Sequence, residues 1–129
     1  MRLLLDTQIW LWSLVSPERL SSRVAALLAD TGNDLNLSAA SGWEIAIKYQ
    51  LGKLSLPEDP ETFIPPRLLR DGIHDLPVSM AHAGRVSRLP MIHRDPFDRL
   101  LVAQAQIEDL TLVTSDPVFG RYRVSLIKG

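Results

Sequence analysis

The sequence predicts an α/β fold in which a mostly parallel sheet of four to five strands is covered by helices on both faces. The main observation is that short apolar or β-branched segments alternate with segments whose apolar residues recur at helical spacing. The length of 129 residues is typical of one domain, and 46% hydrophobic with 22% charged residues is typical of a globular protein. We therefore expect residues 1–129 to form one α/β domain.

The N-terminal half contains two predicted strands and three predicted helices. The first strand ends abruptly at Asp6, and the helix after it is apolar nearly all round, which predicts burial on more than one side. Ser16-Pro17-Glu18 begins the second helix, and Gly52 follows the third at a position where helices commonly end. The predicted elements are strand Arg2–Leu5, helix 7–15, helix 16–30, strand Asp34–Leu37 and helix Ala39–Leu51.

The C-terminal half begins after an acidic, proline-rich loop at residues 55–61. Pro65 and Pro66 weaken the first half of the helix pattern that follows, because proline lacks the backbone N–H that an interior helical position needs. Three helices, three strands and one loop complete the prediction. They are helix Glu61–Arg70, strand His74–Ser79, helix Ala81–Arg88, loop Met91–Pro96, helix Phe97–Glu108, strand Thr111–Ser115 and strand Tyr122–Ile127.

The absence of cysteine excludes several classes of chemistry. Thiolate catalysis, cysteine-ligated zinc, iron–sulfur clusters and a disulfide-rich secreted scaffold all require that residue. The apolar N-terminal run is interrupted by Asp6 and Gln8 and has no small-residue cleavage site, so we do not expect a signal peptide. No apolar stretch approaches the ~20 residues that span a bilayer. We expect a cytoplasmic protein with no membrane segment.

Four acidic residues are predicted to meet at one edge of the sheet. Asp6 follows the first strand and Asp116 follows the strand at 111–115, while Glu44 and Asp98 lie near the beginnings of two helices. In open α/β sheets, ligands bind outside the carboxyl ends of the strands. This edge is therefore the expected active site.

Each acid also has a structural explanation as part of a helix cap. Asp6 and Asp116 can each be an N-cap, and Asp95-Pro96 fits an N-cap followed by proline at the first helical position. Ser41 and Glu44 fit a capping box. Taken singly, each acid is better explained as a cap.

The direction of two side chains favours a functional cluster over four separate caps. Asp98 shares a helix face with Leu101, Val102 and Ala105, and Glu44 shares one with apolar residues of its own helix, so both carboxylates point toward the core. Buried carboxylates are unfavourable by several kcal/mol unless they are paired or bind a metal. The cluster suits Mg²⁺ or Mn²⁺, hard ions that take oxygen ligands.

The chemistry expected of such a site is phosphoryl transfer to water. His74, His82 and His93 are scattered, have no zinc-protease spacing, and are expected to be surface or loop residues. No glycine-rich phosphate loop is present. Metal ions held by carboxylates lower the pKa of water, align its attack on phosphorus and neutralise the leaving oxygen.

Four segments resemble the PIN-domain ribonucleases, and within them the toxin of bacterial VapBC-type toxin–antitoxin pairs. The resemblance implies a three-layer α/β/α sandwich and Mg²⁺-dependent hydrolysis of RNA, with the family's four acids at Asp6, Glu44, Asp98 and Asp116. It also implies a homodimer and a VapB-like antitoxin. The segments, which span most of the chain, are LLLDTQIWLW at 3–12, SGWEIAIKYQLGKL at 41–54, HRDPFDRLLVAQA at 93–105 and LVTSDPVF at 112–119.

Some assignments near the cluster stay open at this point. Asp95 competes with Asp98 for the third acidic position, and the inward phase favours Asp98 as the ligand and Asp95 as the cap. Thr7 and Thr114 are candidate contacts to the metal or the phosphate. The apolar helix at 7–15 is explained either by two-sided burial or by a partner interface.

Three other functions compete with a ribonuclease toxin. A haloacid-dehalogenase-like phosphatase would need an aspartate two residues after Asp6, where this chain has Gln8. A receiver-like phospho-acceptor would need an early acidic pair and a late lysine, and none of Lys48, Lys53 and Lys128 fits. A PIN-like domain without a toxin role, either active in RNA processing or inactive, is the third.

The net charge of −1 argues against a protein that coats nucleic acid without specificity, yet it averages over segregated groups. Eleven of the fourteen basic residues are arginine, which suits bidentate contact with phosphate. Arg85, Arg88, Arg94 and Arg99 flank the expected site in the sequence and are either a phosphate-contacting rim or a solvated surface.

Overall fold

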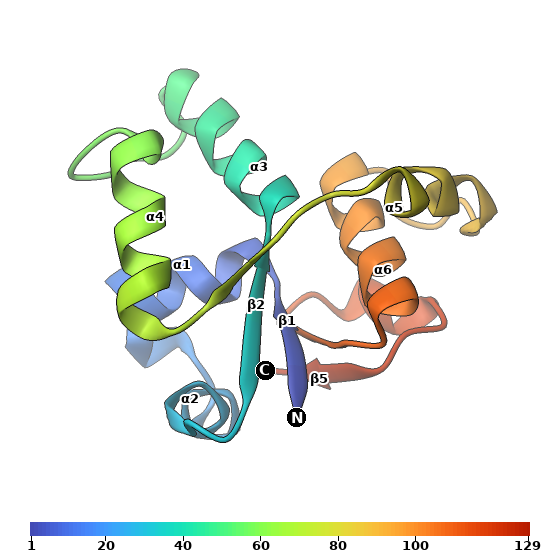
Figure 1. Cartoon of the computed structure of the whole chain (residues 1–129), viewed down its shortest axis with the longest axis horizontal. Coiled ribbons are helices and arrows are strands. Elements are labelled where there is room, and N and C mark those ends of the chain that lie inside the picture. Colours follow the sequence, from blue (N-terminus) through green and yellow to red (C-terminus); the bar gives the residue numbers. More distant parts are fainter.

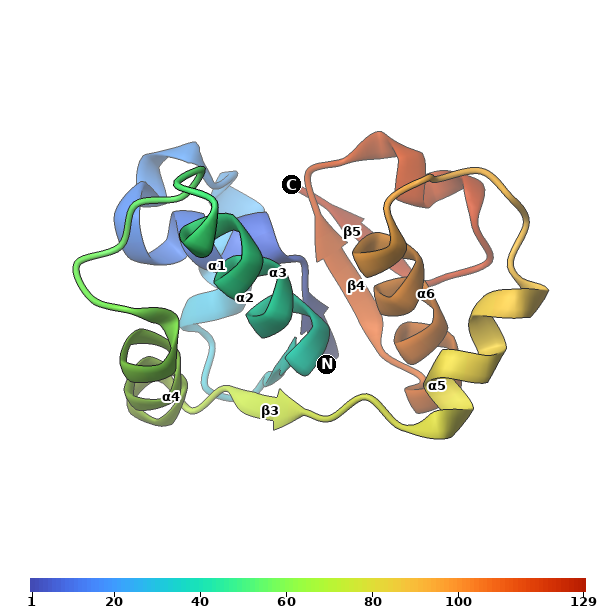
Figure 2. The ribbon, with the colours of Figure 1, turned by 90° about the horizontal axis from the view of Figure 1, so that it is seen from above.

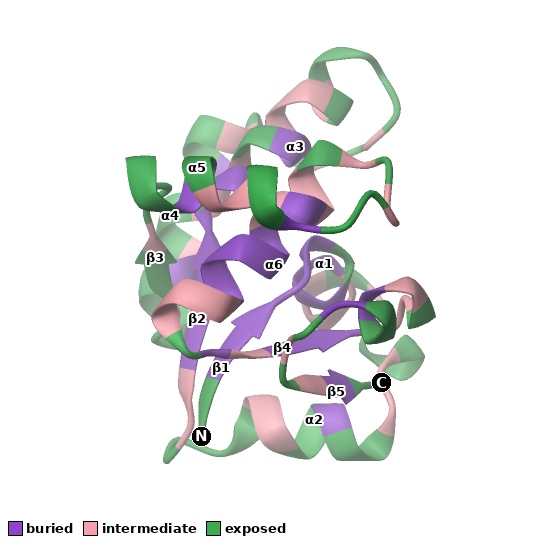
Figure 3. Ribbon diagram, turned by 90° about the vertical axis from the view of Figure 1, so that its right-hand side faces the viewer, coloured by how far each residue is buried: buried purple, intermediate pink, exposed green.

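A five-stranded, entirely parallel sheet organises the chain in a computed structural model that describes residues 1–129. Its order is β3-β2-β1-β4-β5, so the first strand of the chain lies at the centre and later strands are added on both sides (Figure 1). The central strands are buried (Figure 3). The strands are β1 (Arg2–Leu5), β2 (Asp34–Ser38), β3 (His74–Leu76), β4 (Thr111–Thr114) and β5 (Leu126–Lys128).

Helices cover both faces of the sheet (Figure 2). Successive side chains of a strand point to opposite faces, and accordingly Leu3 and Leu5 of β1 belong to one apolar core and Leu4 to a second. The first core contains residues of α1, α2, α3 and α4, and the second is built on α6. The helices are α1 (Thr7–Val15), α2 (Ser22–Ala29), α3 (Ala39–Gln50), α4 (Pro60–Asp71), α5 (Met80–Arg85) and α6 (Pro96–Glu108), with short 3₁₀ helices η1 (Pro17–Arg19), η2 (Val86–Arg88) and η3 (Pro117–Arg121).

The predicted fold class is confirmed, and most differences from the predicted elements lie at their ends. The helix expected from Ser16 is divided, because Ser21 accepts a hydrogen bond from the Val24 N–H and begins α2 after η1. Conversely, α4 continues through Pro65 and Pro66. These prolines are exposed, so water can reach the carbonyls they leave unpaired.

The two edge strands are shorter than predicted. β3 ends at Leu76, immediately before Pro77, which has no N–H to extend the ladder. β5 begins only at Leu126, because the residues before it bond to other parts of the fold: Tyr122 Oη accepts from the His93 N–H and the Arg123 carbonyl accepts from Gln106.

The apolar character of α1 is explained by packing within the chain. Trp10 is fully buried, and its ring meets that of Phe63 of α4 edge to face at 6.2 Å between centroids. Trp12 is partly buried and lies under the guanidinium of Arg19. Burial within the chain therefore accounts for Ile9, Trp10 and Leu11, whereas Val15 at the end of the helix is exposed. No helix of the structure combines the length and apolar character needed to cross a bilayer.

Candidate active site

Acidic side chains that follow β1 and β4, together with others from α3 and the start of α6, surround a cavity of about 480 Å³ at the carboxyl ends of the central strands. We call it the acidic cavity. Asp6 follows β1, Asp116 lies just beyond β4, and α3 and α6 contribute from their N-terminal halves. The five carboxylates that line it are Asp6, Glu44, Asp95, Asp98 and Asp116, and Lys48 and Lys53 are its two basic residues. The four acids predicted to meet are thus brought together.

Asp6 both caps α1 and faces the cavity. Its Oδ1 accepts the Gln8 N–H at 2.8 Å, as an N-cap does, while Oδ2 accepts the Thr114 hydroxyl at 2.5 Å. The side chain is buried, and this burial raises its pKa. The two hydrogen bonds oppose that rise, and the nearby charges of Glu44 and Asp116 add to it.

Thr114 connects two of the acids. While its hydroxyl donates to Asp6, the same oxygen accepts the backbone N–H of Asp116 at 3.0 Å. Asp116 in turn caps η3, because its Oδ1 accepts the Val118 N–H at 2.9 Å. A buried hydroxyl at the end of β4 therefore holds both aspartates in place.

The structure separates the tasks of Asp95 and Asp98. Asp95 is the N-cap of α6, and its Oδ1 accepts the N–H groups of Phe97 and Asp98 at 2.9 and 3.4 Å. Asp98 points inward as its helical phase predicts, and its side chain is only 18% exposed. Burial, and then the charges of Asp95, Asp6, Glu44 and Asp116, raise the pKa of Asp98 to about 8.

His93 lies against this group, although the sequence predicted only a surface or loop residue. Its Nε2 is 2.9 Å from Asp98 Oδ2 and 3.5 Å from Asp116 Oδ2, and its ring packs near Phe119. Its Nδ1 accepts the Asp95 N–H at 3.2 Å, so the neutral ring carries its proton on Nε2, facing the carboxylates. The sequence feature that could have indicated this position is that His93 stands two residues before Asp95, the N-cap of α6.

Glu44 lines the acidic cavity as predicted, but it does not cap its helix. The capping-box interpretation is wrong, because α3 begins earlier: Ser38 is its N-cap and accepts the Ala40 N–H at 3.0 Å. Glu44 is buried, and its Oε2 accepts from Lys48 Nζ at 2.8 Å, one helical turn later. This hydrogen bond raises the pKa of Lys48, so the lysine stays charged and neutralises part of the cluster.

The remaining sequence candidates have different surroundings. Thr7 lines the acidic cavity, but its hydroxyl donates to Ser41 at 2.7 Å and so links α1 to α3. Arg94 is exposed and forms no ion pair. Arg99 does not flank the site: it is buried, and its guanidinium donates to the carbonyls of Pro90 and Val86 at 2.8 and 3.1 Å.

The donor set fits a hard divalent cation. One oxygen each of Asp98 and Asp116, together with His93 Nε2, lie within 4.8 Å of one another. His93 Nε2 is buried and makes no hydrogen bond, although it lies 2.9 Å from Asp98. Because Nδ1 accepts the Asp95 N–H, a neutral ring carries its proton on Nε2, and in that tautomer Nε2 is not a metal ligand. Burial first, and then repulsion among the clustered acids, raises the pKa values of Asp6 and Asp98, and a bound cation would favour their ionised forms.

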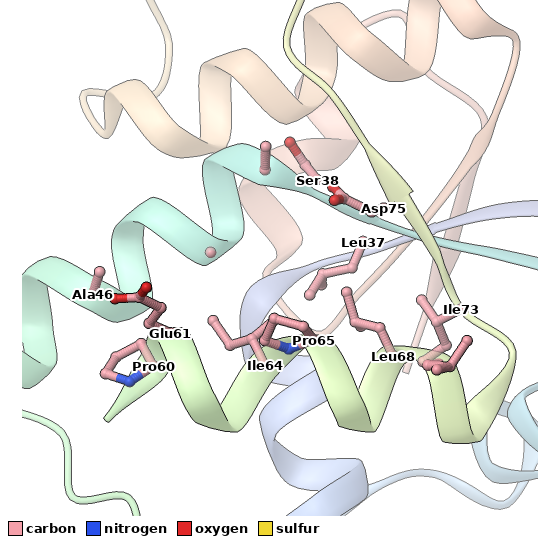
Figure 4. Close-up of a pocket in the computed structure, with 13 residues that line it drawn as sticks. Leu37, Ser38, Ala46, Pro60, Glu61, Ile64, Pro65, Leu68, Ile73 and Asp75 are labelled. Carbon is pink, nitrogen blue, oxygen red and sulfur yellow. The ribbon is translucent and has the colours of Figure 1, made fainter. Parts of the chain in front are cut away.

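A larger cavity of about 550 Å³ lies between α3 and α4 and has a different character (Figure 4). Its walls are mainly aliphatic, with Leu37 and Leu68 from the first core. Glu61 and Asp75 are its only carboxylates, and they belong to separate elements. Its lining offers no cluster of groups for phosphoryl transfer.

Fold and site together define a class: an α/β protein whose parallel sheet gathers carboxylates at its carboxyl edge, around a cavity that suits a divalent metal ion. Within that class, the model of the family described as PIN domain matches residues 3–124. The chain belongs to the PIN domain family. The resemblance to PIN domains inferred from the four segments is thereby confirmed.

Individual relatives extend this result. A segment of 59 residues is 49% identical to Ribonuclease VapC16 of Mycobacterium tuberculosis (strain ATCC 25618 / H37Rv), covering 46% of this chain and 42% of that protein. The match thus spans less than half of the relative's length.

Solved structures resemble the whole chain. One is VapBC2 from Rickettsia felis bound to a DNA fragment from its promoter, with a TM-score of 0.74, 20% identity and coverage of 99% of this chain and 98% of that one. DNA-bound VapBC from Salmonella typhimurium gives a TM-score of 0.73, 16% identity and coverage of 99% and 98%. FitAcB from Neisseria gonorrhoeae gives 0.64, 21% identity and coverage of 98% and 96%. At these identities the likeness concerns the fold.

Proposed function

We propose that this protein is a Mg²⁺- or Mn²⁺-dependent endoribonuclease and the toxin of a VapBC-type toxin–antitoxin pair. The observation that carries the proposal is the set of five carboxylates around one cavity of a PIN domain. The partial match to a protein named Ribonuclease VapC16 supports RNA as the substrate. Membership of the PIN family disfavours the phosphatase and receiver-like alternatives.

In this proposal Asp6, Asp98 and Asp116 hold the metal, and Glu44 completes the acidic set. When bound, the ion activates a water and neutralises charge on the leaving oxygen of the phosphodiester. Thr114 fixes the orientation of Asp6 and Asp116 through its two hydrogen bonds. Asp95 holds the first turn of α6, and with it Asp98.

Three further residues arrange charge and protons around these acids. Lys48 holds the Glu44 side chain in place through its hydrogen bond to Oε2. His93 Nε2 lies 2.9 Å from Asp98 and 3.5 Å from Asp116, where a proton on it offsets part of their mutual repulsion. Arg94, exposed just before Asp95, extends into solvent where the RNA backbone would approach.

The partner in this proposal is a VapB-like antitoxin, and the active form is a homodimer acting in the cytoplasm. The solved structures that resemble the whole chain include VapBC complexes, which supports a partner of that kind. Co-expression with the product of a neighbouring small DNA-binding gene should give a complex that co-purifies. The purified toxin alone should have twice the mass of the chain in light scattering.

The central experiment compares cleavage of labelled single-stranded RNA by the wild type, Asp98→Asn and Asp71→Asn. Asp71 is a matched control because it is an exposed acid of α4 that pairs with Arg70. We expect Mg²⁺ or Mn²⁺ to support cleavage and chelation to abolish it. Asp98→Asn should reduce the rate by at least about 100-fold, since one ligand change typically impairs both metal affinity and chemistry.

The same variants decide between the toxin and an inactive scaffold. Expression of the wild type should arrest bacterial growth, whereas Asp6→Asn should not. Wild-type protein that binds no divalent ion, or cleavage that Asp6→Asn and Asp98→Asn leave unchanged in folded protein, would contradict the proposed site.

A further inference from the structure

A third cavity, of about 530 Å³, is lined by four arginines: Arg85, Arg88, Arg121 and Arg123. We call it the arginine pocket. It lies between the C-terminal end of α5, η2, the last turns of α6 and the residues after β4 that contain η3. Leu89, Pro90 and Gln106 complete its wall, and it shares no lining residue with the acidic cavity.

The charges of the arginine pocket are not neutralised within the chain. Arg2, Arg67 and Arg70 each have a carboxylate partner within 4 Å, whereas none of the four arginines of the pocket has one. Arg85 has only a neutral partner, the side-chain oxygen of Gln106 at 3.3 Å. Asp109 lines a neighbouring cavity but forms no salt bridge with Arg85 or Arg123. The pocket therefore presents unpaired positive charge to an anion.

Hydrogen bonds hold the wall of the arginine pocket in place. Gln106 accepts from Arg85 and donates through Nε2 to the Arg123 carbonyl at 2.9 Å, which ties α5, α6 and the segment after η3 together. The buried Arg99 anchors Pro90 and the start of η2 through their carbonyls. A pocket fixed in this way loses little conformational freedom when an anion binds.

Two segments connect the arginine pocket to the acidic cavity. η3 begins directly after Asp116 and ends at Arg121, and the loop from Pro90 leads to Asp95. Along α6, Asp98 and Gln106 are separated by eight residues, or about 12 Å of helix. A stacked nucleic-acid strand advances about 3.4 Å per nucleotide, so this distance corresponds to roughly three or four nucleotides.

We propose that the arginine pocket binds backbone phosphates of an RNA strand whose scissile bond lies in the acidic cavity, a few nucleotides away. The inference rests on the proposed ribonuclease function and adds a second anchoring site to it. Guanidinium groups bind phosphate oxygens in bidentate fashion without reading the base. The pocket therefore contributes affinity and position, and base identity has little influence there.

The test measures RNA binding in a background that does not cleave. Fluorescence anisotropy of labelled single-stranded RNA is recorded with Asp98→Asn protein, alone and combined with Arg88→Gln and Arg121→Gln. Both arginines are exposed, so the fold should persist, and thermal unfolding checks this. The matched control combines Arg23→Gln and Arg70→Gln. These two arginines are exposed on α2 and α4, and their substitution removes the same amount of charge.

We expect the pocket variant to weaken binding by tenfold or more and the control to change it less than threefold. The slope of log affinity against log salt should fall by about 1.4, because each lost contact to a single strand contributes about 0.7. Equal affinities and slopes for the two double variants would overturn the proposal. So would arginine-dependent binding of poly-glutamate without arginine-dependent binding of RNA, which would assign the pocket to an acidic protein segment.

Failure of the pocket and failure of the proposed function give different results. If the wild type cleaves RNA but the two double variants bind it equally, the function stands and the pocket assignment is wrong. If the wild type cleaves no RNA yet RNA binding depends on Arg88 and Arg121, the pocket stands and the proposed enzymatic activity is wrong.

Discussion

An aspartate can cap a helix and face an active site at the same time, because its two oxygens serve different partners. In Asp6, Oδ1 satisfies the Gln8 N–H and Oδ2 meets Thr114. In Asp116, Oδ1 satisfies the Val118 N–H and Oδ2 faces His93. Capping a helix and lining the acidic cavity are therefore compatible roles for Asp6 and Asp116.

The Thr114 hydroxyl gives a prediction at the scale of one atom. Thr114→Val keeps the shape of the side chain but removes the donor to Asp6 and the acceptor for the Asp116 N–H. We expect metal affinity, measured by calorimetry with Mn²⁺, to fall about 10- to 100-fold, as for other residues that orient metal ligands. RNA cleavage should fall in parallel.

Thr114→Ser is the control for this change, because it retains the hydroxyl and loses only a methyl group. It should keep metal affinity within about threefold of the wild type. A valine variant that binds Mn²⁺ as tightly as the serine variant would show that the hydroxyl does not orient the ligands.

Two neighbouring charged residues of α6 point in different directions from the helix. Asp98 faces the acidic cavity, whereas Arg99, one position later, is turned to the carbonyls of Pro90 and Val86. Successive helical residues are rotated by about 100°, so two adjacent charged residues rarely share a face. Arg99 therefore belongs to the stability of the molecule and to the wall of the arginine pocket.

Arg99→Leu should destabilise the protein by about 2–4 kcal/mol in urea unfolding. The change removes two hydrogen bonds from a charged donor, and such bonds contribute about 1.5–3 kcal/mol each. The two carbonyls keep the backbone N–H groups of Leu89 and Ile92, which limits the loss. Arg94→Leu is the matched control, because Arg94 is exposed and forms no ion pair, and it should change stability by less than about 0.5 kcal/mol. Equal effects of the two substitutions would mean that the bonds of Arg99 contribute little.

The elements that the sequence predicted well are those whose ends have strong local signals. β1 ends at Asp6, and α6 begins where Asp95-Pro96 supplies a cap and a proline, so the inward direction of Asp98 could be predicted. The beginning of α3 at Ala39 was also predicted, but its cap was not: Ser38 and Ser41 are equally good caps, and the end of β2 at Ser38 decides between them.

Contacts between distant segments had no such signal. His93 approaches Asp98 and Asp116 because Tyr122, 29 residues away, accepts its backbone N–H at 2.7 Å. The four members of the arginine pocket come from residues 85–88 and 121–123, which only the packing of α5, α6 and η3 brings together. Composition and periodicity describe single segments, so neither feature could be derived from them.

Across the whole molecule, opposite charges are separated into two cavities. The net charge of −1 averages over the whole chain, which includes an acidic cavity with five carboxylates and two lysines and an arginine pocket with four guanidinium groups that form no ion pair. A metal ion in the first and RNA phosphate at the second would each compensate local charge. Such a distribution is typical of a protein that binds its substrate at a defined place and not over its whole surface.

The acidic cavity should make the stability of the metal-free protein depend on pH. The pKa of Asp98 is about 8 in the folded protein, against 3.8 for an unperturbed aspartate, so the folded state binds the extra proton more tightly than the unfolded state. This contribution to stability is fully present below about pH 4 and is lost as the pH rises to about 8. Asp6, whose pKa is also raised, acts in the same direction.

We expect the metal-free wild type to lose about 2 kcal/mol of unfolding free energy between about pH 5 and pH 8.5, since solvent screens part of the interaction in this partly exposed cluster. Urea unfolding at the two pH values in the presence of a chelator measures this loss.

The Asp98→Asn variant has no carboxylate at this position and should lose most of the pH dependence, whereas the Asp71→Asn variant should retain it. Mg²⁺ at millimolar concentration should restore stability at the higher pH in the wild type and much less in Asp98→Asn, because a ligand that binds only the folded state stabilises it. A wild type whose stability is independent of pH and of Mg²⁺ would show that the carboxylates neither repel one another nor bind the ion, and the metal site would then have to be abandoned.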